Sequence, residues 1–327
     1  MIHVHGGSVL LNGIREAGIP GERLEWREVL CQGPTPGGLA DDAWYALRAA
    51  FLAQQGPELD DIRRELEAQD DALLQAAATQ DEIVLWFGPE LFCQAILVRL
   101  LALFADHPPT KARLSLVSID HYPGVDDHRS CTIGMLFGEQ LVDVFQRRVP
   151  VSQAQLELGR RAWEAMGATT PEALAAFVRG DTSALPYLGA ALTRLLAELP
   201  DESTGLSRTE RLILDALGAG TKTGFELFVL ANEPEPRRWL TDTILIDNLK
   251  RLAAGSNPFL EMGVNGGNAL NVAVKRTDTA AKVISGAVDA IELREIDRWV
   301  GGTHLTPQNV WRWDAASGRV TQRPATI

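Results

Sequence analysis

The segment from Met1 to Ala17, MIHVHGGSVLLNGIREA, decides the fold of the N-terminal part of the chain. It predicts a short strand at Ile2–His5, a tight turn at Gly6-Gly7-Ser8 and a helix at Val9–Ala17. Paired glycines let a ligand approach the backbone, and Ser8 can cap the helix, whose free N–H groups attract anions. The segment is therefore either a ligand-binding turn or a plain connection, and it lacks the GxGxxG pattern of the usual dinucleotide site.

Further strands and helices alternate after this segment. Alternation at Leu24–Leu30 and apolar runs at Glu82–Phe87 and Ala112–Ser118 predict three more strands. Helices are predicted between them at residues 41–54, 60–77 and 90–105. Because strands that alternate with helices form parallel sheets, we expect residues 1–125 to be a doubly wound, Rossmann-like α/β domain.

The middle of the chain changes to a helical pattern. Residues 138–199 read as helical throughout, with a capping box at Ser152. Residues 126–200 are therefore predicted to form a helical region packed on the first domain. The polar stretch Pro200–Gly205 that follows is typical of a linker.

The last part combines short helices with short strands. Helix starts are predicted at Ser207, Thr223 and Thr241, and strand-like pieces follow at 259–262, 269–274 and 283–291. Three helices followed by a hairpin predict a winged-helix-like α+β domain over residues 201–327. If this domain bound the DNA major groove, the helix that begins at Thr241 would present basic or amide side chains along its exposed side. That side mixes acidic and basic residues instead, which favours a protein partner over DNA.

Charge is distributed unevenly along the chain. The net formal charge is −12, with 16 Lys and Arg against 27 Asp and Glu in residues 1–200, and 15 against 16 in residues 201–327. An acidic body repels phosphate backbones, so nucleic acid is disfavoured as a partner of the first part. The chain has no membrane-spanning apolar run, no visible signal sequence and only the scattered cysteines Cys31, Cys93 and Cys131, so we expect a cytoplasmic protein.

Three strand-end loops are predicted to meet at one edge of the sheet: Gly6-Gly7-Ser8, Gln32-Gly33-Pro34 and Gly88-Pro89-Glu90. Glu28, near Trp26, occupies the place where some Rossmann domains hold a ribose hydroxyl, or it is merely the polar end of a strand. The predicted ligand-binding residues are His3, His5, Gly6, Gly7, Ser8, Trp26, Glu28, Gln32, Gly33, Glu90 and Gln94. An anionic ligand also needs a cation, for which Arg148, Arg160 or Arg194 is a candidate.

Histidines and cysteines near this edge allow two interpretations. His3 and His5 point to the same side of a strand and could bind zinc together with Cys31 or Cys93, or they are buried structural histidines. If Cys93 lies near a helix N-terminus, its pKa would be lowered and its thiolate would be reactive. In the alternative interpretation, Cys31 and Cys93 are small buried side chains without a chemical role. No metal site is predicted, and the sequence leaves the identity of any cofactor unknown.

Ser8 also resembles the serine of GDS-type hydrolases. Those enzymes need an Asp-x-x-His arrangement late in the same domain. The pairs Asp120-His121 and Asp127-His128 do not have that spacing, so the hydrolase interpretation is disfavoured.

Several motifs occur in the same order as in one bacterial family. They are His3-x-x-Gly6-x-Ser8, Trp26-Arg27-Glu28-Val29-Leu30 with Gly33-Pro34, Leu85-Trp86-Phe87, Leu185-Pro186, Gly205–Glu210, Trp299–Gly302 and Trp311–Asp314. On these motifs, the chain resembles the group named domain of unknown function 1835, with its usual C-terminal companion. The resemblance extends over the whole chain; it implies a Rossmann-like N-terminal half and no activity.

The chain departs from that family at three polar positions. The family usually has Asp where this chain has Gly7, a Glu-His-Asp-like run at Gly88-Pro89-Glu90, and Asp-Gln at Cys93-Gln94. The resemblance therefore implies a site that has changed its substrate or lost a reaction. We expect an enzyme, or an enzyme-derived binding protein, that holds a small anionic or nucleotide-like ligand. The alternative is a regulator or adaptor that uses the C-terminal domain to bind a protein or DNA.

Overall fold

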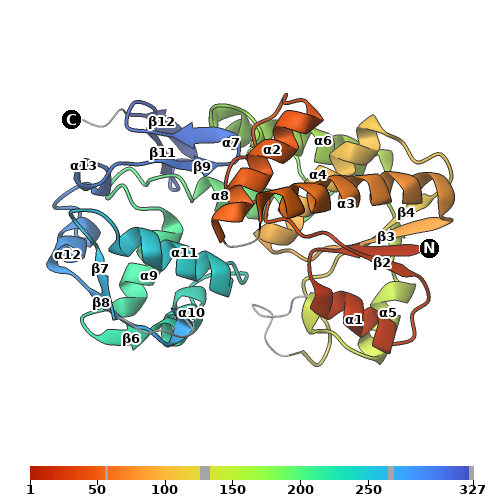
Figure 1. Cartoon of the computed structure of the whole chain (residues 1–327), viewed down its shortest axis with the longest axis horizontal. Helices are drawn as coiled ribbons and strands as arrows, with labels where there is room; N and C mark the ends of the chain where they lie inside the picture. The colour runs from red at the N-terminus through yellow and green to blue at the C-terminus, as the bar shows by residue number, and fades with distance from the viewer. Residues whose placement is uncertain (56–57, 126–132, 264–268, 324–327) are drawn as a thin grey trace. The chain divides into compact units, whose positions relative to one another are not determined.

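A five-stranded sheet forms the centre of the N-terminal half in the computed structural model, which describes residues 1–55, 58–125, 133–263 and 269–323 (Figure 1). The first four strands are parallel and the fifth is antiparallel. The spatial order is β2-β1-β3-β4-β5, so the chain leaves β1 to one side and returns to its other side. The strands are β1 (Ile2–His5), β2 (Glu22–Glu25), β3 (Glu82–Trp86), β4 (Arg113–Val117) and β5 (Val149–Pro150).

Helices cover both faces of this sheet (Figure 1). On one face, apolar side chains of α1 and α5 form a core with Val84 and Trp86 of β3. On the other face lie α3 and α4, with α2 packed on α3 and α6 packed on α4. These helices are α1 (Ser8–Glu16), α2 (Asp41–Leu52), α3 (Leu59–Thr79), α4 (Leu91–Asp106), α5 (Glu139–Gln146) and α6 (Gln153–Met166). A strand buried on both faces explains the continuous apolar run in β3.

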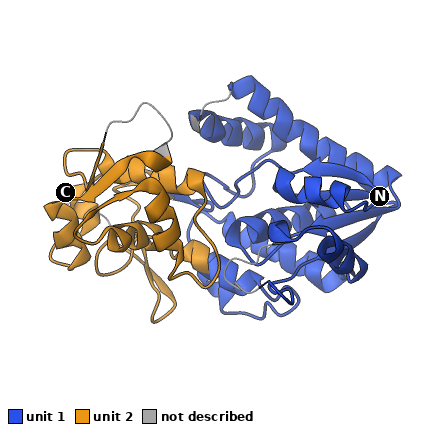
Figure 2. Ribbon diagram, turned by 90° about the horizontal axis from the view of Figure 1, so that it is seen from below, with its two compact units in different colours: residues 1–193, 299–303 blue, residues 194–298, 304–327 orange. Residues whose placement is uncertain are grey.

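The chain divides into two units, which Figure 2 shows in different colours. The first comprises residues 1–193 with Trp299–Thr303, and the second comprises Arg194–Arg298 with His304–Ile327. The returning segment is tied into the first unit by backbone hydrogen bonds, from Thr35 N to Gly301 O (3.0 Å) and from Gly302 N to Met166 O (2.8 Å). Helices α7 (Glu172–Val178) and α8 (Leu188–Leu196) lead up to the division.

The second unit contains a three-helix group and small antiparallel sheets. Three strands pair in the order β6-β8-β7, and β11 pairs with β12. Capping boxes at Ser207 and Thr223 start α9 and α10, as the sequence predicted. The elements are α9 (Arg208–Leu217), β6 (Thr221–Thr223), α10 (Gly224–Asn232), α11 (Asp242–Ala253), β7 (Leu260–Met262), β8 (Ala273–Arg276), α12 (Asp278–Ile284), α13 (Ala290–Leu293), β11 (Trp311–Asp314) and β12 (Arg319–Gln322). The paired strands β9 (Arg298–Val300) and β10 (Thr303–Leu305) overlap the segment Trp299–Thr303, which belongs to the first unit.

Four predicted elements differ in the structure. The strand-like piece predicted at 269–274 begins with a 3₁₀ helix at Ala269–Asn271, and β8 starts only at Ala273. The strand predicted at 283–291 is wrong, because helix α12 runs to Ile284 and α13 begins at Ala290. The region 138–199 is not wholly helical, because β5 adds an antiparallel edge strand to the sheet. The second strand ends at Glu25 rather than Leu30.

The fold as a whole is mixed α/β. The first unit has a mostly parallel sheet with helices on both faces, and the second has short helices with small antiparallel sheets. Within the described part of the chain, no helix has both the length and the apolar character that crossing a bilayer requires.

Candidate functional site at the carboxyl edge of the sheet

The segments that follow β1, β2 and β3 leave the sheet at the same edge. In the parallel register, Val4 lies opposite both Leu24 of β2 and Leu85 of β3. One further hydrogen bond, from Trp26 N to His5 O (2.9 Å), holds the second segment against the first. The strands β1, β2 and β3 thus end at one edge, as predicted, and the meeting of the three loops in one ligand site stays a prediction.

The turn at Gly6-Gly7-Ser8 begins helix α1 at this edge. Gly7 is the N-cap residue and makes no side-chain capping bond, so the prediction that Ser8 caps the helix is wrong. The Gly7 N–H donates instead to Nδ1 of His5 (2.9 Å). Gly6 and Ser8 are exposed, which leaves the start of α1 open to solvent and suited to an anion.

The two histidines of β1 are buried inside the first unit. Trp86 Nε1 donates to Nδ1 of His3 (3.1 Å), so Nε2 carries the proton and donates to Pro20 O (3.0 Å). Both ring nitrogens of His3 thus have protein partners, which argues for the structural interpretation. Burial lowers the pKa of His3 and of His5. In the residues that the structure describes, no three His, Cys, Asp or Glu side chains group closely enough to hold a metal ion.

Glu28 is committed to a buried arginine that the sequence analysis did not single out. Arg48 of α2 is fully buried, and its Nε donates to Glu28 Oε1 (2.5 Å). Its Nη atoms donate to three backbone oxygens of the loop, those of Val29 (3.1 Å), Gln32 (2.8 Å) and Pro34 (3.0 Å). Arg48 therefore fixes the conformation of residues 28–34, and Glu28 acts as its counterion rather than facing a ligand.

Gln32 and Gly33 form the turn of that fixed loop. Gly33 has a φ of +67°, and a Cβ there would lie 2.5 Å from the ring of Phe51. Phe51 in turn lies under the Arg48 guanidinium, at 5.2 Å from the ring centroid. The loop needs glycine at this position for both reasons.

The segment after β3 buries its polar side chains beneath the edge. Glu90 is the N-cap residue of α4, and Cys93 and Gln94 lie in its first turn. Gln94 Nε2 donates to Gly88 O (2.7 Å), which ties the helix to the loop. All three side chains are at most 3% exposed.

The predicted reactive thiolate at Cys93 is wrong. Burial raises the pKa of the Cys93 thiol well above its usual value, and the neighbouring Glu90 and Cys31 raise it further. Desolvation thus outweighs the helix N-terminus. Cys31 and Cys93 are buried and form no disulfide, and they lie close enough for Cys31 to affect the pKa of Cys93.

Two buried polar atoms of the strand-end segments have no hydrogen-bond partner among the described residues. They are the indole Nε1 of Trp26 and the amide Oε1 of Gln94, and both side chains are 1% exposed. Buried polar groups are rarely left unsatisfied without a bound water or ligand. Each therefore has hydrogen-bonding capacity for a water molecule or another polar group.

The predicted cations are each paired elsewhere. Arg148 binds Glu82 (2.9 Å), Arg160 binds Glu157 (2.7 Å) and Arg194 binds Glu235 (2.8 Å). The pair Asp127-His128 and Cys131 lie outside the described residues.

Comparison with known proteins adds no relative. No family model matches the chain, and no curated protein matches it. The resemblance to the domain of unknown function 1835 group therefore stays a prediction, and the function must be argued from the residues themselves.

Proposed function

We propose that the carboxyl edge of the five-stranded sheet binds a small anionic or nucleotide-like metabolite. The strand order carries the proposal. In open α/β sheets, ligands bind where neighbouring strands lead their connections in opposite directions. The order β2-β1-β3-β4 puts that point between β1 and β3, where the Gly6-Gly7-Ser8 turn and the Gly88–Gln94 segment leave the sheet. On this proposal the first unit is a Rossmann-like domain.

Two kinds of group support this ligand class. The exposed start of α1 provides backbone N–H groups for an anion. The buried Trp26 indole N–H and Gln94 amide oxygen provide one donor and one acceptor for an uncharged portion. A nucleotide has both parts, a phosphate and a polar ring system, and the first unit offers each a matching partner. The proposal is one of binding; the raised pKa of Cys93 gives no support to thiolate chemistry.

Replacing Gly7 by Asp or Asn tests the anion site. A Cβ at Gly7 meets only the His5 ring, at 3.5 Å, and its φ of −150° suits any residue. Both Asp and Asn are good N-cap residues, so both variants should fold at least as well as the parent. Only Asp adds a negative charge, whose repulsion of an anion about 4 Å away is on the order of a few kcal/mol.

We expect nucleoside mono- and diphosphates, added singly, to bind the parent and Gly7→Asn, and to bind Gly7→Asp about a hundredfold more weakly. Isothermal titration calorimetry measures the affinities. Equal affinities for Asp and Asn would refute an anion at this turn. No binding of any nucleotide to the parent would refute the nucleotide-like class.

A second candidate function rests on the topology of the second unit. The order α9-β6-α10-α11-β7-β8, with strands paired as β6-β8-β7, fits a winged helix. We propose an adaptor role in which α11 contacts a protein partner, since its exposed positions include Asp242 and Lys250. Retention on duplex DNA that weakens steeply with salt would favour a DNA partner instead, and no retention at low salt would exclude DNA.

A further inference from the structure

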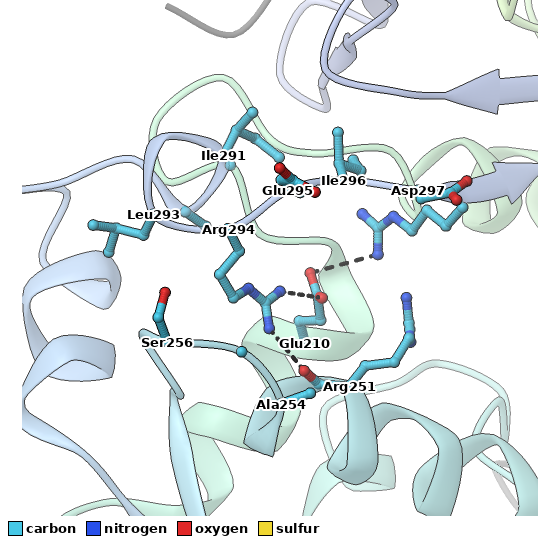
Figure 3. Close-up of a pocket in the computed structure, with 14 residues that line it drawn as sticks. Glu210, Arg251, Ala254, Ser256, Ile291, Leu293, Arg294, Glu295, Ile296 and Asp297 are labelled. Atoms are coloured by element: carbon cyan, nitrogen blue, oxygen red, sulfur yellow. Dashed lines mark hydrogen bonds and ion pairs between the residues drawn. The ribbon is translucent and has the colours of Figure 1, made fainter. Parts of the chain in front are cut away.

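A pocket of about 510 Å³ lies wholly within the second unit (Figure 3). It is lined by the start of α9, the end of α11 and residues 290–298, which include α13. A volume of this size is typical of sites that enclose a small metabolite. The lining residues that carry charge inside it are Glu210, Arg251, Arg294 and Arg298.

Three arginines gather around one buried carboxylate. Arg294 Nη2 donates to Glu210 Oε1 (3.2 Å), and Arg298 Nη1 lies 3.6 Å from Glu210 Oε2. Arg294 Nη1 also donates to the backbone oxygen of Arg251 (3.1 Å), which joins this residue to the end of α11 (Figure 3). Glu210 is itself occupied, because Oε2 accepts the Ser207 N–H (2.8 Å) as part of the capping box of α9.

The interior of the pocket carries more positive than negative charge. Burial raises the pKa of Glu210, but Arg298, Arg294 and Arg251 outweigh it and lower the pKa to about 2, so Glu210 is ionised. One carboxylate is thus shared by three guanidiniums. Glu295 and Asp297 also line the pocket, but both are exposed, and Asp297 pairs with His304 (2.7 Å), so solvent screens them.

Two guanidinium nitrogens have unused hydrogen-bonding capacity. The Nε atoms of Arg251 and Arg298 are buried and have no hydrogen-bond acceptor among the described residues. Arg251 Nε lies 3.4 Å from Asp247 Oδ2 as an ion pair without a hydrogen bond. Buried donors without acceptors are costly, and the guanidinium fork matches the oxygens of a phosphate.

We infer that this pocket binds the phosphate group of a small phosphorylated metabolite, with Arg251 and Arg298 as its principal contacts. A phosphate adds negative charge beside three guanidiniums that have only Glu210 and Asp247 as carboxylate partners, and it supplies further acceptors for Arg251 and Arg298. The site is separate from the sheet edge of the first unit, and it requires neither the nucleotide-like ligand nor the winged-helix interpretation.

A matched pair of variants on α11 tests the inference. Arg251→Gln removes a pocket cation, whereas Lys250→Gln removes the same charge from the neighbouring exposed position, which is not in the lining. With inorganic phosphate as the probe in calorimetry, we expect about a tenfold loss of affinity for Arg251→Gln and an unchanged affinity for Lys250→Gln. Equal losses in both variants would indicate general surface attraction and overturn the site.

A third variant predicts a change of opposite sign. Glu210→Gln keeps an oxygen that can accept the Ser207 N–H but removes the competing negative charge. Phosphate affinity should therefore rise about tenfold, a result that damage to the fold cannot produce. If phosphate binds neither the parent nor Glu210→Gln, the inference is overturned. If succinate binds as tightly as phosphate, the assignment of the ligand as a phosphate is overturned. Gly7→Asp should leave phosphate binding here unchanged, which separates this result from the test of the sheet edge.

Discussion

Arginine has opposite roles in the two units. In the first unit, Arg48 is fully buried and uses four of its five N–H donors on Glu28 and three backbone oxygens, so it holds a loop rather than facing a ligand. In the second unit, Arg251 and Arg298 each keep a buried Nε without an acceptor. Unused hydrogen-bonding capacity, rather than burial or charge alone, thus distinguishes an arginine that supports the fold from one that can bind a ligand.

The two sites also differ in how they can attract an anion. At the sheet edge, the groups that can attract an anion are the backbone N–H groups at the start of α1, because the cations predicted for the edge are paired with carboxylates and the buried Glu90 is acidic. The pocket of the second unit offers the charged guanidinium groups of Arg251, Arg294 and Arg298. This difference agrees with the acidic composition of residues 1–200 and the near balance of residues 201–327.

The largest expected effect is the loss of folding stability when Arg48 is replaced. Arg48→Met leaves the Glu28 carboxylate buried without its cation, which costs about 3–5 kcal/mol in the free energy of unfolding. The control is Arg64→Met, since the Arg64 side chain is 73% exposed and its loss should cost at most about 1 kcal/mol. Urea unfolding followed by circular dichroism measures both. A loss below about 1 kcal/mol for Arg48→Met would contradict its structural role.

Acid should act on the second unit through Glu210. Its pKa is lowered from 4.5 to about 2 by the arginines that outweigh burial. The folded state therefore favours the ionised form, and this stability is present above pH 4.5 and is lost as the pH falls from 4.5 towards 2. The shift corresponds to about 3 kcal/mol.

Hydrogen exchange of the α9 peptide across this pH range measures that loss. Glu210→Gln should remove the pH dependence, because the amide does not titrate. An α9 peptide whose protection falls equally in the parent and in Glu210→Gln would contradict the assignment to this carboxylate.

The sequence pattern predicted the frame of the first unit well, because its signals are local. The apolar run of β3 and the glycine turn after β1 each lie within a few neighbouring residues. The two-residue strand β5 and the three-residue strand β6 are too short to carry a periodic signal and depend on the strands with which they pair. The segment 283–291 has apolar residues typical of a strand, but the N-cap Thr277 and the positive φ of Gly286 divide it between two helices.

The sheet edge was easier to predict than the pocket of the second unit, again because only local signals can be read from the sequence. Adjacent strand-end loops could be placed together from strand order alone, whereas the pairing of Glu28 with Arg48 joins residues 20 positions apart. The pocket joins Glu210 to Arg294 across 84 positions, and no spacing in the sequence indicates that contact. The direction of the Cys93 pKa shift depended on burial, which a helix start in the sequence does not reveal.

The smallest expected effect is on the histidine beside the glycine turn. Burial lowers the pKa of His5, although the Gly7 carbonyl oxygen, 3.2 Å from Nδ1, opposes the shift, so the folded first unit favours the neutral ring. Stability from this group is therefore present above its ordinary pKa of 6.5 and is lost as the pH falls below that value.

His5→Asn offers an amide oxygen to the Gly7 N–H in place of Nδ1 and does not titrate. Hydrogen exchange of the β1 peptide should lose protection between pH 6.5 and 5 in the parent and less in His5→Asn, while the α9 peptide stays unchanged in both. A parallel decline of the β1 and α9 peptides over that range would contradict the contrast between the two units, because Glu210 titrates only at lower pH.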